Sequence, residues 1–333
     1  MRQSVVRCRR HLGLGLLLLG TLGCGFEPLS AEPEIAVESE VIVEPGVIAE
    51  SEVIVEPEVI VESGTTAVSG EAIVGTPTTQ SEALLWSGDW SASDWQDDWQ
   101  IRSDGSWGFE NLEVVVEPET ASADPTPFLR VHYPAGSATP SVARTHNVAR
   151  GGAQYYADLN LPSYERLRLR YQVRFSNNFD FVRGGKLPGL FGGNGASGGN
   201  IPNGTDGFSA RLMWREDGNG EVYAYLPTSE NFGTSIGRGN WQFRPGEWMT
   251  VEQEVILNQP GIADGRIRLW IDDALVVDAS GLVFRTVDTL RIDGIFFSTF
   301  FGGNDLSWAT PQDVYVDFAD FTIHASEAGA LHN

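Results

Sequence analysis

The feature that most constrains the fold is a repeated alternation of apolar and polar residues in short segments. In residues 166–175, leucine, tyrosine, valine and phenylalanine alternate with arginine and glutamine. The same period of two recurs in residues 208–214, 222–226 and 249–255. This period is typical of strands with one buried and one solvated face. Turn residues separate the segments, and no segment shows a long helical period.

Further strands are expected where β-branched and aromatic residues cluster between turn signals. They are residues 128–133, 266–271, 274–278, 289–299 and 314–323. Many strands joined by glycine-rich turns predict an all-β chain, a β-jelly-roll sandwich with a concave substrate-binding sheet. Four tryptophans between residues 86 and 99 mark the start of this domain, which we place at 84–325, followed by a tail at 326–333.

Residues 1–24 are typical of an export signal. Four arginines precede an apolar run that is too short to span a membrane. The segment ends in Gly-Thr-Leu-Gly-Cys24, which resembles a bacterial lipobox. Cys24 would then carry a lipid that anchors the exported protein in the envelope. Ordinary cleavage near Ala31 would instead give a freely secreted protein.

Residues 25–83 are expected to form a disordered acidic linker. The heptapeptide at 39–45 recurs unchanged at 51–57, and residues 26–84 hold 13 acidic residues and no basic one. The acidic side chains of this segment repel one another, and its prolines disfavour regular structure, so an extended chain is expected. The valine and isoleucine runs leave a short solenoid as the alternative.

Composition excludes several kinds of partner and site. The folded part carries 18 basic and 32 acidic residues, which argues against a nucleic-acid partner. The only other cysteine, Cys8, lies in the signal, so the mature domain has no disulfide and no cysteine metal site. The loop 192–207 contains Asn and Asp but lacks calcium-loop spacing. We expect no metal, no cofactor and a monomer.

Lys186 is the only lysine among 22 basic residues, and it lies between glycines and a proline in the stretch 184–190. Lysine is a compact point charge on a flexible stem, and arginine does not replace it. A chain that uses arginine elsewhere is therefore expected to need an ammonium at this position. The alternative is an ordinary solvated lysine in a loop.

Residues 208–226 are predicted to form a hairpin that turns at 217–220. Its apolar residues must share the core side, and this parity gathers a polar set on the other face. That set is Ser209, Arg211, Met213, Tyr223 and Tyr225.

We expect Arg215 to pair with Glu221, because this register keeps the apolar residues of both strands on the core side. Arg211 is then opposite Tyr225, and Met213 is opposite Tyr223.

Two cations and two phenols suit the cleavage of uronic-acid polymers by β-elimination. A base takes the C5 proton, an acid protonates the departing O4, and cations stabilise the enediolate charge. Tyrosine can act as the base if cations lower its pKa from about 10. Lys186, Arg211, Tyr223 and Tyr225 would make a complete set. The alternative is an ordinary solvated sheet face.

Four stretches in this order resemble polysaccharide lyase family 14: 184–190, 208–215, 223–225 and 297–303. The resemblance runs from about residue 84 to residue 323. That family contains alginate and glucuronan lyases with a β-jelly-roll fold. The resemblance implies a lyase whose lysine and arginine neutralise the substrate carboxylate and whose tyrosine pair is acid and base, in either order. The implied functional positions are Lys186, Ser209, Arg211, Tyr223 and Tyr225.

The expected substrate is an acidic polysaccharide, alginate ahead of glucuronan. Expected contacts to it are Arg144, His146, Arg215, Ser298 and Thr299, although a histidine such as His146 is more often structural. The loop 192–207 is a candidate lid. The loop 300–305 resembles its Gly-Gly-Asn turn and is expected at the same end of the sheet.

Two other functions remain open. A glycoside hydrolase needs two carboxylates that flank the cut, and Glu252 with Glu254 or Asp313 with Asp317 would supply them, although both pairs suit a solvated face equally well. A non-catalytic, lectin-like carbohydrate-binding module on the cell envelope would use the tryptophans and a concave sheet. Such a module has no need for Lys186 and paired tyrosines at one spot.

Overall fold

The computed structural model describes residues 83–117 and 127–325. The predicted export signal, the candidate lipidation site Cys24, the predicted acidic linker up to residue 82 and the predicted C-terminal tail lie outside these residues. Within the described ranges, no helix has both the length and the apolar character needed to cross a membrane.

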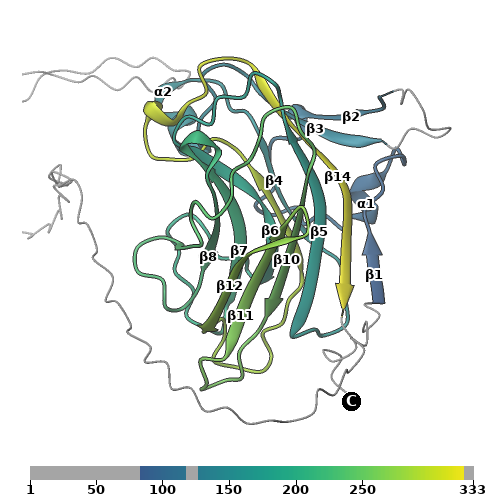
Figure 1. Cartoon of the computed structure of the whole chain (residues 1–333), viewed down its shortest axis with the longest axis vertical. Coiled ribbons are helices and arrows are strands. Elements are labelled where there is room, and N and C mark those ends of the chain that lie inside the picture. The colour runs from purple at the N-terminus through teal and green to yellow at the C-terminus, as the bar shows by residue number, and fades with distance from the viewer. Residues whose placement is uncertain (1–82, 118–126, 326–333) are drawn as a thin grey trace, which may run out of the picture. The chain divides into compact units, whose positions relative to one another are not determined.

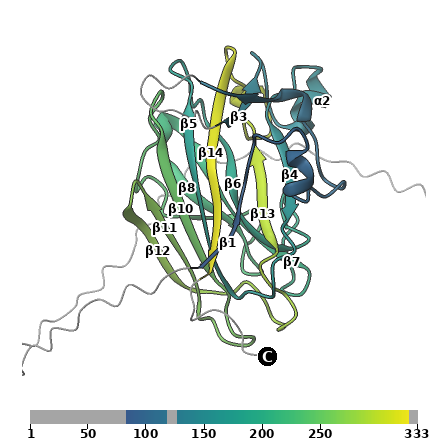
Figure 2. The ribbon, with the colours of Figure 1, turned by 90° about the vertical axis from the view of Figure 1, so that its right-hand side faces the viewer.

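Two antiparallel sheets form the domain (Figure 1). The larger sheet runs in the order β12-β11-β10-β5-β14-β3-β2, and β1 pairs with β14, as Figure 2 shows. Its strands are β1 (Ala83–Ser87), β2 (Leu112–Val115), β3 (Phe128–Tyr133), β5 (Arg166–Phe175), β10 (Met249–Ile256), β11 (Gly265–Ile271), β12 (Ala274–Leu282) and β14 (Val314–Ala325).

The smaller sheet runs in the order β4-β13-β6-β7-β8-β9. Its strands are β4 (Ala153–Asp158), β6 (Gly184–Gly193), β7 (Gly207–Arg215), β8 (Gly220–Tyr225), β9 (Thr234–Ile236) and β13 (Gly294–Thr299). The helices described are α1 (Trp95–Asp98) and α2 (Pro140–His146), with short 3-10 turns at Phe109–Asn111, Glu216–Gly218 and Leu306–Trp308. The arrangement confirms the predicted jelly-roll sandwich.

The alternating pattern locates most strands well and misses others. The strands predicted at 128–133 and 166–175 match β3 and β5. The one predicted at 289–299 is wrong in its first half, because β13 begins at Gly294. The pattern gives no strand for β6, whose glycines and proline hide any alternation.

The core between the sheets is rich in aromatic rings. Trp99 is fully buried, stacks on Trp90 at 4.4 Å and meets Phe321 edge-on at 5.1 Å. Three of the four N-terminal tryptophans are therefore buried core residues, with Trp86 packed edge-on against Trp99. They anchor the start of the domain to β14.

Strand β6 contains a β-bulge next to the lysine. Its register against β7 shifts between Leu187 and Leu190. Pro188 has no N–H for the ladder and is tolerated at such a bulge. A Cβ on Gly189 would lie 2.1 Å from a carbonyl oxygen of β7, so only glycine fits. As a result Leu187 and Leu190 both face the core, while Lys186 lines the outer pocket.

Two buried polar side chains of the larger sheet reach across the core to this bulge. Gln253 accepts a hydrogen bond from the Leu190 N–H at 2.9 Å and donates to the Ala210 carbonyl at 2.7 Å. The Tyr171 hydroxyl donates to the Pro188 carbonyl at 3.2 Å. These bonds satisfy backbone groups near the bulge and tie the lysine-bearing strand to the opposite sheet.

Replacing Gln253 by leucine tests this link. Gln253→Leu leaves a buried N–H and a buried carbonyl without that partner, so we expect a loss of roughly 2–4 kcal/mol in the free energy of unfolding. Urea denaturation measures it. Gln172→Leu, on the outer face of β5, is the control and is expected to change stability by less than about 0.5 kcal/mol. Equal effects of the two substitutions would show that Gln253 is no cross-sheet tie.

Candidate active site

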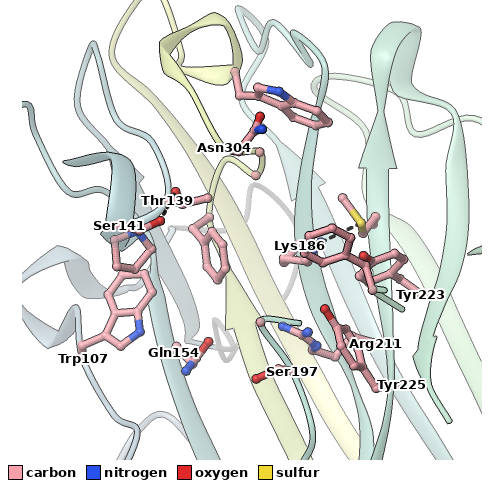
Figure 3. Close-up of a pocket in the computed structure, with 18 of the residues that line it drawn as sticks. Trp107, Thr139, Ser141, Gln154, Lys186, Ser197, Arg211, Tyr223, Tyr225 and Asn304 are labelled. Carbon is pink, nitrogen blue, oxygen red and sulfur yellow. Dashed lines mark hydrogen bonds between the residues drawn. The ribbon is translucent and has the colours of Figure 1, made fainter. Parts of the chain in front are cut away.

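A pocket of about 800 Å³ lies over the outer face of the smaller sheet (Figure 3). One wall comes from β6, β7 and β8, and the facing wall comes from α2, Trp107 and the segment after β13. Its lining includes basic, aromatic and thioether side chains: Trp107, Arg144, Lys186, Arg211, Met213, Arg215, Tyr223, Tyr225 and Trp308.

Lys186 projects into this pocket from β6. Its Nζ lies 2.8 Å from the Met213 Sδ and 4.0 Å from the centre of the Tyr223 ring. Burial, and then the positive charges of Arg211 and Arg215, hold the pKa of Lys186 well below that of an ordinary lysine. A neutral amine is therefore reached at a lower pH here than on a solvated lysine.

Arg211 forms the floor of the pocket and is only 2% exposed. Its Nη1 donates to the Ser298 Oγ at 3.0 Å, and the guanidinium lies over the Phe296 ring at 4.4 Å. Burial lowers the pKa of Arg211, but a guanidinium remains charged in a protein. Among the described residues no carboxylate lies within ion-pair distance of Arg211 or Lys186. Burying a charge without a partner is unfavourable. Arg211 stays charged and can receive an anion, whereas Lys186 is shifted toward its neutral amine.

Tyr223 and Tyr225 lie beside these cations, with ring centres 5.7 Å apart and planes at 83°. The Gly199 N–H donates to the Tyr225 hydroxyl oxygen at 3.0 Å. Burial, followed by the neighbouring Tyr225, raises the pKa of Tyr223 to about 12. The condition under which Tyr223 could act as the base, a pKa lowered by cations, is therefore not met, since desolvation outweighs the charge of Arg215.

The structure confirms the shared face of the hairpin but corrects its register. Arg211 pairs with Tyr223, and Met213 pairs with Glu221, which is a shift of two residues from the prediction. The cause is the turn, where Asp217 and Gly218 adopt left-handed conformations and Arg215 N–H bonds to a carbonyl only four residues on. A shift by two preserves the face, because the side-chain period is two.

A family model described as Polysaccharide lyase 14 matches residues 121–321. The chain belongs to polysaccharide lyase family 14. It is therefore a polysaccharide lyase. No curated protein matches it.

Solved structures resemble the lyase over most of their length. The marine PL-14 alginate lyase from Aplysia kurodai is 32% identical, with a TM-score of 0.63, and the match covers 72% of this chain and 98% of that one. Alginate lyase vAL-1 from Chlorella virus is 21% identical, with a TM-score of 0.58, over 73% and 99%. Alginate lyase Aly36B is 22% identical, with a TM-score of 0.57, over 75% and 98%. At the two lower identities the likeness shows the fold alone.

Of the other predicted site residues, Arg144 and Arg215 line the pocket of the lyase. Ser209 is buried, and its Oγ donates to the Ala196 carbonyl at 2.6 Å, at the root of the loop 194–206. Ser298 is buried against Arg211. Both serines thus support parts of the pocket from beneath.

Two predicted substrate contacts are placed elsewhere. Thr299 is buried and hydrogen-bonded to the core residue Tyr133, so its side chain lies behind the sheet. His146, at the end of α2, is exposed and does not line the pocket, although Arg144 on the same helix does.

Two loops enter the pocket from opposite ends of β6. The loop 194–206 follows the end of β6 and contributes Ser197 and Gly198. The segment after β13 pairs with the start of β6, where the Phe300 carbonyl accepts the Lys186 N–H at 2.9 Å. The expectation that the two loops share one end is therefore wrong, because β13 runs antiparallel to β6.

The carboxylates considered for a hydrolase lie away from the pocket of the lyase. Glu252 and Glu254 are engaged by arginines on the outer face of the larger sheet, at 3.1 Å to Arg168 and 2.6 Å to Arg166. Asp317 is buried between two arginines of the same sheet. In the described part of the chain, no cluster of three or more His, Cys, Asp or Glu side chains suits a metal ion.

The sequence patterns did not predict that aromatic residues of the facing wall line the pocket. Trp107 and Trp308 both line the pocket, and each carries an arginine over its ring, Arg150 at 5.2 Å and Arg183 at 5.0 Å. These tryptophans lie about 200 residues apart in the chain, so no local pattern joins them.

Gly233 gives a test of the tyrosine geometry. An added Cβ would lie 2.9 Å from the rings of both Tyr223 and Tyr225. Gly233→Ala is therefore expected to displace the rings and lower kcat of the lyase by roughly tenfold or more, because small misplacements of reacting groups are costly. The melting temperature is expected to change little. Gly136→Ala, which meets no atom within 4 Å, is the control for a glycine replacement, although its positive φ adds local strain. An unchanged kcat in Gly233→Ala would contradict the required ring positions.

Proposed function

We propose that this lyase cleaves a uronic-acid polymer, alginate, by β-elimination. The observation that carries the proposal is the pair of basic side chains, Lys186 and Arg211, which have no carboxylate partner among the described residues and lie beside two phenols. A polymer with a carboxylate on each sugar supplies the missing charge. The relatives named above as alginate lyases support this choice. Two further Aly36B structures, of double mutants, contain an alginate tetrasaccharide and an alginate trisaccharide.

Arg211 neutralises the uronate carboxylate in this mechanism. The C5 proton becomes acidic enough to leave only when charge that moves onto the carboxylate is stabilised. A buried guanidinium, held by Ser298 and Phe296, is a fixed positive charge at the floor of the pocket. It therefore stabilises the enediolate without having to reorganise.

Lys186 is the base that takes the C5 proton. Its lowered pKa makes the neutral amine accessible at a lower pH than on a solvated lysine, and the neutral amine is the form that can accept a proton. Arginine has no comparable neutral form. This assignment departs from the roles that the family resemblance implied, in which the lysine only neutralised charge.

Tyr223 is the acid. With a pKa of about 12 it keeps its proton across the neutral range and can give it to the departing glycosidic oxygen. The electron pair left at C5 forms the C4–C5 double bond as the C4–O4 bond breaks. Solvent then returns the proton from the Lys186 ammonium to the phenolate. Tyr225, 5.7 Å away and held by Gly199, fixes the position of the Tyr223 ring.

The facing wall binds the rest of the polymer. Trp107 and Trp308 offer ring faces to the apolar faces of sugars, and Arg144 offers a charge to a neighbouring uronate. Figure 3 shows Trp107 across the pocket from Lys186 and Tyr223.

The ultraviolet absorbance of the unsaturated uronate product tests the proposed function. Purified protein is expected to release this product from alginate, with polyglucuronate and neutral glucans assayed in parallel. If the unsaturated product is released from polyglucuronate and not from alginate, the substrate is glucuronan. Absence of product from every uronan between neutral and alkaline pH, with retained binding, would favour the carbohydrate-binding module instead.

Replacing Lys186 by arginine separates a base from a mere positive charge. Lys186→Arg and Lys186→Ala are both expected to lower kcat by roughly 10²–10⁴-fold, because neither side chain can accept the proton. Arg244→Lys, in an exposed ion pair with Glu247, is the control and is expected to retain full activity. Substantial activity in Lys186→Arg would mean that the position supplies charge only.

A further inference from the structure

A fully buried carboxylate lies next to the cationic part of the pocket. Glu221 on β8 is paired with Met213 on β7, which in turn is paired with Lys186 on β6. The three residues therefore form one row across adjacent strands, spaced ~4.8 Å apart, on the pocket face of the sheet. Glu221 has no exposed surface and does not line the pocket itself.

Three side chains engage this carboxylate. The Arg215 Nε donates to one oxygen of Glu221 at 2.8 Å. The Ser235 Oγ donates to the other oxygen at 2.6 Å, and the Arg238 Nε lies 3.5 Å from that same oxygen. Arg215 is in turn the residue whose guanidinium lies 5.8 Å from the centre of the Tyr223 ring.

A negative charge in this place needs an explanation. The pocket gathers cations for a polyanion, and a buried carboxylate beside them weakens the attraction for that substrate. Burying a carboxylate is also unfavourable unless it is well paired. Glu221 meets that condition only through Arg215, Ser235 and Arg238, so its role lies in what it holds.

We propose that Glu221 is a positioning residue that fixes Arg215 beside Tyr223 and sets the charge balance around Lys186. The inference rests on the proposed function, in which Lys186 is the base and Tyr223 the acid. Without Glu221, the guanidinium of Arg215 is released from its anchor, and the cations of the pocket repel one another without compensation.

The charged groups around Glu221 give the direction of its effect. Lys186 lies in the same cross-strand row on β6, Arg215 of β7 is bonded to Glu221, and Arg238 approaches it from the turn after β9. Arg211 and Tyr223, a directly opposed pair, lie two residues along β7 and β8 on the same face. The negative charge of Glu221 opposes the fall in the Lys186 pKa that burial and the two arginines cause. Removing that charge lowers the Lys186 pKa further, so the amine becomes neutral at a lower pH.

The sole lysine allows a direct measurement. Protein labelled with ¹³C at the lysine Cε gives one lysine resonance, which reports the titration of Lys186 alone. In Glu221→Gln we expect that titration to move to lower pH by roughly 1 unit, on the scale of one charge acting across a few strands. The acidic limb of kcat/KM on alginate is expected to move in the same direction.

Glu254→Gln is the matched control. Glu254 is also a buried carboxylate held by arginines, Arg166 and Arg268, but it lies in the other sheet. We expect no change in the lysine titration of this variant. A Glu221→Gln variant that loses rate equally at every pH, with an unmoved lysine resonance, would overturn the proposal. The lysine resonance reports on Glu221 even if the wild-type protein does not cleave alginate. Failure of the Glu221 proposal can therefore be told apart from failure of the proposed function.

A second variant covers the case in which Glu221→Gln does not fold. Arg238 is 56% exposed, so its removal is tolerated more easily. Arg238→Gln takes away a positive charge next to Glu221 and is expected to move the Lys186 titration to higher pH by a few tenths of a unit, because solvent screens an exposed charge. An unmoved or acid-shifted titration would contradict the proposed charge balance.

Discussion

Two basic side chains, Lys186 and Arg211, lie in one pocket with no carboxylate of the described residues at ion-pair distance. On the larger sheet, by contrast, Arg130 and Arg174 share the buried Asp317, at 2.7 Å each. Lys186 and Arg211 are held instead by a thioether, a hydroxyl and aromatic rings, which tolerate a cation without neutralising it. Such a site is stable only if the surrounding fold is rigid, and the cross-core bonds of Gln253 supply part of that rigidity.

The sole lysine of the chain follows from the same constraint. Burial beside guanidiniums lowers the pKa of any neighbouring base, but only lysine responds by becoming a usable amine. Arg211 under the same burial stays charged and serves as the fixed cation. In the proposed mechanism one position thus requires lysine and the other requires arginine, although both residues are basic.

Period-two alternation was enough to place the hairpin residues on one face and to identify a two-sheet fold, because side-chain parity survives errors of two residues in register. It was not enough for the register itself, which depends on left-handed residues at Asp217 and Gly218. Nor did it show β6 as a strand, since the bulge at Pro188 interrupts alternation. The raised pKa of Tyr223 depends first on desolvation in the folded chain, which local sequence does not show.

Substrate binding and base strength are coupled in such a pocket. The field that lowers the Lys186 pKa comes partly from Arg211 and Arg215. When a uronate carboxylate pairs with Arg211, it offsets part of that field, and the proton affinity of the amine rises. In the proposed mechanism the amine therefore loses its proton readily before the polymer arrives and becomes a stronger base once the C5 proton is within reach. A neutral sugar in the same pocket would leave the Lys186 amine weakly basic. The substrate carboxylate would thus both bind to Arg211 and strengthen Lys186 as a base.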